Sequence, residues 1–115
     1  MSEIRDIQSD EFHQEVKQSD QPVALLYWMR SCDGCRKFKP VFQQLPDIFP
    51  DTKFLQMNMM KSIENLRLSE SLDVEATPTT VFFCQGVKVG MLVGYRPLEQ
   101  VKKEIQEILE SNNCI

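Results

Sequence analysis

The sequence predicts an α/β fold in which helices cover both faces of a mixed β-sheet, a three-layer α/β/α architecture. Apolar runs typical of strands alternate with segments whose apolar residues recur every three or four positions, as on one face of a helix. Strands separated by helices require right-handed parallel crossovers. The runs at residues 79–84 and 87–93 are instead separated by a short turn, which predicts an antiparallel hairpin.

The first third of the chain supplies a short strand, a helix and a central strand. Residues 4–7 can form the first strand, and Ser9 is suited to cap a helix that presents Phe12 and Val16 at i, i+4 spacing. Residues 23–29 are apolar at both odd and even positions. That pattern is typical of a strand buried on both faces, so we expect this segment near the middle of the sheet.

The middle of the chain continues the alternation. A helical stripe of apolar residues runs from Cys35 to about Ile48, and Pro40 within it should kink the helix. Residues 53–59 form the next strand, and Ser62 can cap the helix that follows. The apolar residues expected on that helix are Ile63, Leu66 and Leu72. The methionines expected to pack around the strand are Met57, Met59 and Met60.

The C-terminal part consists of the hairpin and a last helix. The hairpin turns at Gln85-Gly86, and Pro97 lies near the first helical position, where its missing N–H has no cost. The apolar face of this helix comprises Leu98, Val101, Ile105, Ile108 and Leu109. The charged residues expected on its solvated face are Glu99, Lys102, Lys103, Glu104, Glu107 and Glu110.

Composition excludes several classes of function. The 115 residues fit a single domain, residues 1–115, with 42% apolar and 26% charged residues. A net charge of −4 argues against general binding to nucleic acid or to a membrane surface. No apolar run approaches the roughly 18 residues that cross a bilayer, and the acidic, mixed start lacks the pattern of a signal peptide. We therefore expect a cytoplasmic protein.

The four cysteines are too few for a disulfide scaffold, and in the cytoplasm they are reduced by default. Cys32 and Cys35 form a C-x-x-C motif between an apolar strand and a helix. Cys84 lies within an apolar run, where we expect it to fill space in the core. Cys114 is the penultimate residue, which we expect on a frayed tail, able to form an intermolecular disulfide in air but without an assigned function.

The position of the C-x-x-C motif indicates redox chemistry. The free N–H groups and the dipole at a helix N-terminus favour a negative charge, so Cys32 should ionise more readily than an ordinary thiol. Helical spacing brings Cys35 close enough to form a disulfide and to resolve a mixed disulfide formed by Cys32. Two alternatives remain: half of a zinc site, for which His13, Cys84 and Cys114 show no partner spacing, and an inert buried pair.

These residues resemble the active-site segment of the thioredoxin family. The matching features are the segment Trp28-Met29-Arg30-Ser31-Cys32-Asp33-Gly34-Cys35, Pro40 in the following helix, the loop Ala76-Thr77-Pro78-Thr79 and Gly94 after the last strand. The resemblance extends over essentially the whole chain and implies a thioredoxin-like fold.

The resemblance also implies a role for each residue. Cys32 would be the exposed nucleophile and Cys35 the more buried resolving thiol. Pro78 would be a cis proline facing the disulfide, which leaves the Thr77 backbone free to pair with an incoming peptide. Beyond the two catalytic cysteines, the residues expected to contact substrate are Trp28, Asp33, Gly34, Thr77, Pro78 and Gly94.

The sequence departs from the family pattern at five positions. Asp33-Gly34 replaces the usual Gly-Pro, and the added carboxylate beside Cys32 should disfavour its thiolate, although nearby basic residues oppose this effect. Ser31 replaces the usual aromatic residue. Leu26 stands where the family commonly has a buried aspartate, and Gln56 replaces the accompanying lysine. We therefore expect Cys35 to lose its proton to water or to a surface group, with Asp33 as a candidate, and to resolve slowly near neutral pH.

The resulting hypothesis is a monomeric thiol–disulfide oxidoreductase that reduces disulfide-containing proteins and is recharged by a separate reductase. It requires no bound cofactor and no metal, because the cysteine pair carries both electrons. A glutaredoxin is disfavoured because Gly94-Tyr95-Arg96 replaces the Gly-Gly pair usual in that family, and an isomerase is disfavoured by a reducing compartment. The alternative from another class is a thioredoxin-fold binding or redox-regulatory module with weak or no turnover.

Overall fold

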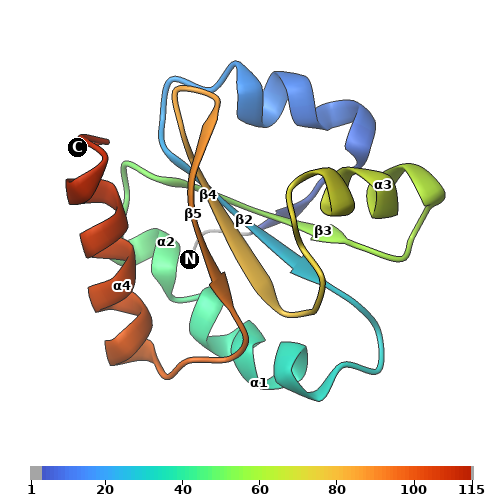
Figure 1. The fold of residues 1–115 in the computed structure, drawn as a ribbon. Helices are drawn as coiled ribbons and strands as arrows, with labels where there is room; N and C mark the ends of the chain where they lie inside the picture. The colour runs from blue at the N-terminus through green and yellow to red at the C-terminus, as the bar shows by residue number, and fades with distance from the viewer. Residues whose placement is uncertain (1–3, 115) are drawn as a thin grey trace.

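A computed structural model describes residues 4–114, which form a five-stranded mixed sheet with helices on both faces (Figure 1). The strands are β1 (Arg5–Asp6), β2 (Val23–Trp28), β3 (Lys53–Asn58), β4 (Thr79–Cys84) and β5 (Val87–Val93). Their order in the sheet is β1-β3-β2-β4-β5. The first three strands are mutually parallel, and β4 is antiparallel to both β2 and β5. The predicted fold class is therefore confirmed.

The helices form the two outer layers. The apolar residues of each helical layer pack against one face of the sheet. One layer holds α1 (Asp33–Phe42), α2 (Leu45–Ile48) and α4 (Leu98–Ser111), and the other holds η1 (Ser9–Glu11), η2 (His13–Lys17) and α3 (Ile63–Ser71) (Figure 1). Within residues 4–114, no helix is both long and apolar enough to cross a bilayer.

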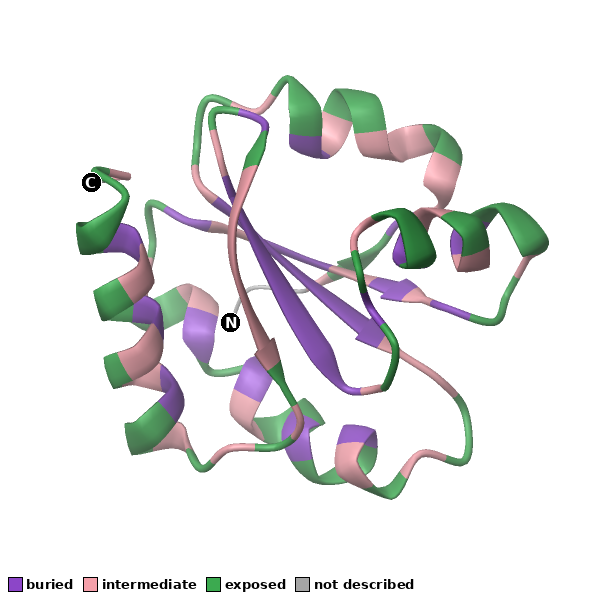
Figure 2. Cartoon of the chain, in the orientation of Figure 1, coloured by how far each residue is buried: buried purple, intermediate pink, exposed green. Residues whose placement is uncertain are grey.

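The core consists of two apolar clusters separated by the sheet. Successive side chains of β2 point to opposite faces, so Leu25 and Tyr27 enter one cluster while Ala24 and Leu26 enter the other. All of these side chains are buried, as predicted from their lack of alternation (Figure 2). Because β2 is packed on both faces, its C-terminal end holds the residues that follow in a fixed position.

Two helices differ from their predicted form. The segment after β1 is a 3₁₀ turn followed by a π-helical turn, and Ser9 does not cap it. Gln8 is the capping residue: its backbone N–H donates to Glu11 Oε1 at 2.9 Å, while the Ser9 N–H donates to Asn65 Oδ1 at 2.8 Å. The helix containing Pro40 ends at Phe42, and α2 is a separate short helix rather than the continuation of a kinked one.

The helix α3 begins as predicted, but its apolar face was partly misassigned. Ser62 caps it by accepting a hydrogen bond from Asn65 N–H at 3.0 Å. Ile63 is 54% exposed, and the buried residues of α3 are the polar Asn65 and Ser69. Met60 is likewise exposed, whereas Met57 and Met59 are buried. Asn65 is buried because its side chain holds the start of η1 to the end of β3.

Candidate functional site

The C-x-x-C motif lies at the junction between β2 and α1, where the sequence placed it. Cys32 is the N-cap of α1, and its Sγ accepts a hydrogen bond from Cys35 N–H at 3.1 Å. The two residues form a disulfide, and their Cα atoms are 5.2 Å apart. Cys32 is half-buried, whereas Cys35 is only 8% exposed. Cys32 is therefore the more accessible of the two sulfur-bearing residues.

The charges around the motif differ from the sequence expectation in one respect. Asp33 follows Cys32 directly, but its side chain is 88% exposed and pairs with Arg36 at 3.2 Å. Solvent and this guanidinium both weaken its repulsion of a Cys32 thiolate. The ten-residue helix α1 favours a negative charge on Cys32 through its dipole and through the Cys35 N–H, which donates to Cys32 Sγ.

A second loop, residues 76–79, faces the disulfide. The Thr77–Pro78 peptide bond is cis, as the resemblance implied, and Pro78 is buried. Thr77 Oγ1 donates to Cys32 Sγ at 3.3 Å, and the Thr77 carbonyl oxygen lies 3.5 Å from the same sulfur. Gly34 makes this contact possible, because a Cβ at that position would lie 2.9 Å from Pro78 Cδ. A side chain at position 34 would therefore require Pro78 or the backbone of residue 34 to shift.

Gly94 completes this side of the site. Its N–H donates to the Pro78 carbonyl oxygen at 2.7 Å, which ties the end of β5 to the proline loop. Its φ of +91° is a conformation that glycine adopts readily and other residues adopt rarely. No heavy atom lies within 4 Å of the position that a Cβ would occupy. The surface here is open for the close approach of another backbone.

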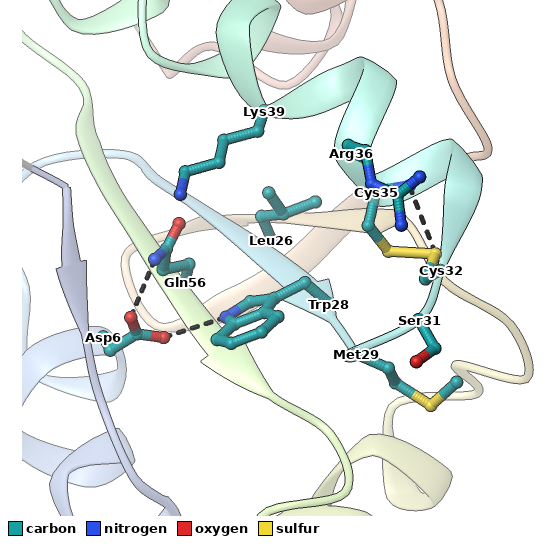
Figure 3. A pocket seen from close by; sticks show the side chains of 10 residues that line it. All are labelled: Asp6, Leu26, Trp28, Met29, Ser31, Cys32, Cys35, Arg36, Lys39 and Gln56. Carbon is teal, nitrogen blue, oxygen red and sulfur yellow. Dashed lines mark hydrogen bonds between the residues drawn. A yellow bond between two sulfur atoms is a disulfide. The ribbon is translucent and has the colours of Figure 1, made fainter.

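A cavity of about 250 Å³ lies beside the disulfide, and none of the residues 76–79 lines it (Figure 3). Its lining includes both cysteines, Trp28, and Leu26 and Gln56, which replace the buried aspartate and the lysine of the family pattern. The remaining lining residues are Asp6, Met29, Ser31, Arg36 and Lys39. Trp28 therefore lines the same cavity as the two cysteines.

Asp6 is a residue of this site that the sequence reasoning missed. Its carboxylate accepts hydrogen bonds from Trp28 Nε1 and from Gln56 Nε2, both at 2.8 Å (Figure 3). Leu26 is buried beside this network and leaves no unpaired charge in the core. The carboxylate that lines the cavity with Cys35 is thus supplied by β1, not by Asp33, which faces solvent. The pairing of β1 with β3 brings Asp6 opposite Gln56, a register that the sequence alone did not indicate.

The other two cysteines correct our sequence predictions. Cys84 is not simply a space-filling core residue, and Cys114 is not on a frayed tail. They form a second disulfide, with their Cα atoms 5.8 Å apart. Among the residues described by the structure, no group of three or more His, Cys, Asp or Glu side chains is arranged to hold a metal ion.

Comparison with known proteins finds a matching family, related sequences and a similar solved structure. The family model described as Thioredoxin matches residues 3–107. Thioredoxin from Alicyclobacillus acidocaldarius is 26% identical over 102 residues, which are 89% of this chain and 95% of that protein. Thioredoxin 1 from Nostoc sp. is 27% identical over 109 residues, covering 95% of this chain and 100% of that protein. The solved structure of a thioredoxin from Malassezia sympodialis superposes with a TM-score of 0.78 at 25% identity, covering 93% of this chain and 91% of that one.

Proposed function

The chain belongs to the thioredoxin family, and from this premise we propose that it reduces disulfide bonds in other proteins. Family membership and the Cys32–Cys35 pair together support thiol–disulfide oxidoreductase activity in general. The observation that carries the finer proposal is the asymmetry of the pair. A half-buried sulfur at a helix N-terminus faces an open backbone loop, and its partner lies buried beneath it.

Substrate would bind across the proline loop. Within residues 4–114 the Thr77 N–H has no backbone hydrogen-bond partner, and Gly94 leaves space beside it. A segment of a substrate protein could therefore add to this loop as an extended strand, with its disulfide over Cys32. Trp28 would support the nucleophile from the cavity side, and Asp33 and Gly34 would form the floor under the substrate.

The chemistry requires two exchange steps. The Cys32 thiolate attacks one sulfur of the substrate disulfide, forming a mixed disulfide and releasing the first substrate sulfur as a thiol after it takes up a proton. Cys35, once deprotonated, attacks Cys32 Sγ and releases the second substrate thiol. The protein is left with the Cys32–Cys35 disulfide, and a separate reductase would return the two electrons.

The proton of Cys35 is proposed to leave through the cavity. Leu26 cannot accept a proton, and Asp33 points to solvent. Asp6 is an acceptor on the far wall of the same cavity, although two hydrogen bonds already stabilise its charge. This longer route is consistent with the expected slow resolution near neutral pH.

A trapping experiment tests this function. We expect the native chain to reduce insulin with dithiothreitol as the electron source, and the Cys35→Ser variant to lose turnover and to accumulate a mixed disulfide through Cys32. Cys32→Ser is the matched control, because it removes the attacking sulfur and should neither turn over nor trap. Equal turnover in the Cys35→Ser variant and the native chain would contradict the proposal. Absence of turnover in both would favour the alternative of a binding or regulatory module.

A further inference from the structure

The second cysteine pair lies at the other end of the sheet from the proposed active site. Thr79 begins β4 next to the proline loop, and Cys84 ends it. Five residue steps in a strand span roughly 17 Å. The Cys84–Cys114 disulfide is therefore too distant to take part in exchange at Cys32 within one molecule, and its role must be sought separately.

The fold brings these two cysteines together through local features that do not depend on the bond between them. Side chains alternate along β4, so Cys84 points to the same face as Phe82, the face covered by α4. The turn after Cys84 is tight because Gln85 and Gly86 both have positive φ, of 54° and 77°. Gly86 packs against the Lys17 carbonyl oxygen, which a Cβ would contact, and this fixes the end of the hairpin.

The C-terminal end of α4 turns Cys114 inward. Asn113 has a φ of 55°, and its N–H donates to the Glu110 carbonyl oxygen at 3.2 Å. The Cys114 N–H donates to the Leu109 carbonyl oxygen at 2.8 Å. These two bonds are the Schellman arrangement, in which the last residue folds back over the helix beside a buried apolar position. Leu109 is that position, and Cys114 packs against the same core cluster.

From this convergence we infer that Cys84 and Cys114 form a second thiol–disulfide site, which exchanges with small-molecule disulfides and fastens α4 to the sheet when oxidised. Both residues are partly exposed, so a molecule the size of oxidised glutathione can reach them. Their Cα separation of 5.8 Å lies in the range that disulfides span without backbone movement.

Oxidised glutathione can serve as the oxidant that converts the two thiols into the Cys84–Cys114 disulfide. One of the two thiolates attacks a glutathione sulfur, forms a mixed disulfide and releases one glutathione. The other thiolate then attacks the protein sulfur of that mixed disulfide, closes the Cys84–Cys114 bond and releases the second glutathione. Two electrons pass from the protein thiols to glutathione disulfide, and the two thiol protons end on the two released glutathione thiols.

The experiment uses the full chain carrying Cys32→Ser and Cys35→Ser, so that Cys84 and Cys114 are the only cysteines that can react. After treatment with oxidised glutathione, peptide mapping by mass spectrometry should show one linked pair of tryptic peptides and no retained glutathione. Adding Cys84→Ser should leave a persistent glutathione adduct on Cys114, and adding Cys114→Ser should leave one on Cys84. Retained glutathione with both cysteines present, or a disulfide-linked dimer, would overturn the inference.

A second measurement tests the fastening of α4. Closing a loop across a sequence separation of 30 should raise the thermal midpoint of the oxidised protein by about 10 °C over the reduced one. Adding Cys84→Ser and Cys114→Ser to the parent that carries Cys32→Ser and Cys35→Ser should abolish this dependence on the oxidant. Asn113→Gly, which keeps the positive φ, should close as fast as the parent, and Asn113→Val should close several-fold more slowly. Equal thermal midpoints for the oxidised and reduced parent would contradict the fastening.

Discussion

The two cysteine pairs share one kind of bond but lie in opposite electrostatic and topological settings. Cys32 and Cys35 are three residues apart, and Cys32 caps the N-terminus of α1. Cys84 and Cys114 are thirty residues apart, and Cys114 lies just beyond the C-terminus of α4. The helix dipole favours a thiolate at the first place and disfavours one at the second.

Because of this difference, we expect the two pairs to differ in reactivity although their Cα atoms are similarly close. Both pairs have Cα separations compatible with a disulfide, 5.2 and 5.8 Å, so distance alone does not distinguish them. The Cys32–Cys35 pair has one sulfur at a helix N-terminus, an open loop beside it and a buried partner. The second pair has none of these and joins two elements distant in sequence. We therefore expect rapid exchange with proteins at the first pair and a slower, stabilising closure at the second.

The largest expected effect is in the rate of alkylation of the reduced protein. At pH 7 Cys32 should react with iodoacetamide about tenfold faster than Cys114, because the two helix ends shift the thiolate fraction in opposite directions. The rates are read for each peptide by mass spectrometry during a time course.

The same experiment includes its own control. In denaturant the helices are lost, and the two cysteines should react at rates within about twofold of each other. If Cys114 reacts as fast as Cys32 in the folded protein, helix position does not separate the two pairs.

Much of this comparison was accessible from the sequence. The C-x-x-C motif, its place at the end of an apolar strand and the hairpin follow from local patterns, whereas the cis Thr77–Pro78 loop was implied by the family resemblance. These signals are strong because a buried central strand and a capped helix each impose a short, regular pattern on the chain.

The features that the sequence did not predict are those set by register and by side-chain direction across the sheet. Asp6 reaches the cavity only because β1 pairs with β3 opposite Gln56. Cys114 was expected on a frayed tail because an Asn-Asn-Cys end has no periodic signal. The alternation of β4 does place Cys84 beside Phe82, on the face of α4, and this was the signal that could have led to the second pair.

A change of intermediate size is expected from restoring an acid beside Cys35. In stopped-flow reduction of a model disulfide, Leu26→Asp should speed the resolving step several-fold near pH 7, because a carboxylate inside the cavity shortens the proton's path. Burial should raise the pKa of the introduced carboxyl, so the gain appears as pH rises through that value. It disappears at high pH, where Cys35 ionises unaided.

Leu26→Asn is the matched control for this variant, because it has a similar shape and cannot accept the proton. It should resolve no faster than the native chain. Identical rates for the Asp and Asn variants from pH 6 to 9 would show that the proton is not limiting, and the departure at Leu26 would then have no kinetic consequence.

The smallest expected effects come from two glycine substitutions, one in β5 and one directly after it, each of which should affect only one of the two cysteine pairs. At Gly90 a Cβ would lie 3.2 Å from two carbon atoms of Ile108. Gly90→Ala should therefore push the C-terminal end of α4 away from β5. We expect a loss of about 1 kcal/mol in the free energy of unfolding, measured by urea denaturation. Closure of the Cys84–Cys114 pair should also slow about twofold, with insulin reduction unchanged.

Gly94→Ala should show the reverse pattern. Its Cβ meets no heavy atom within 4 Å, but its φ of +91° is unfavourable for alanine, and the strain falls on the link between β5 and the proline loop. Insulin reduction should fall while closure of the second pair keeps its native rate. If either substitution changes both activities by the same factor, the two sites are coupled through β5, and the independence argued from their separation along β4 does not hold.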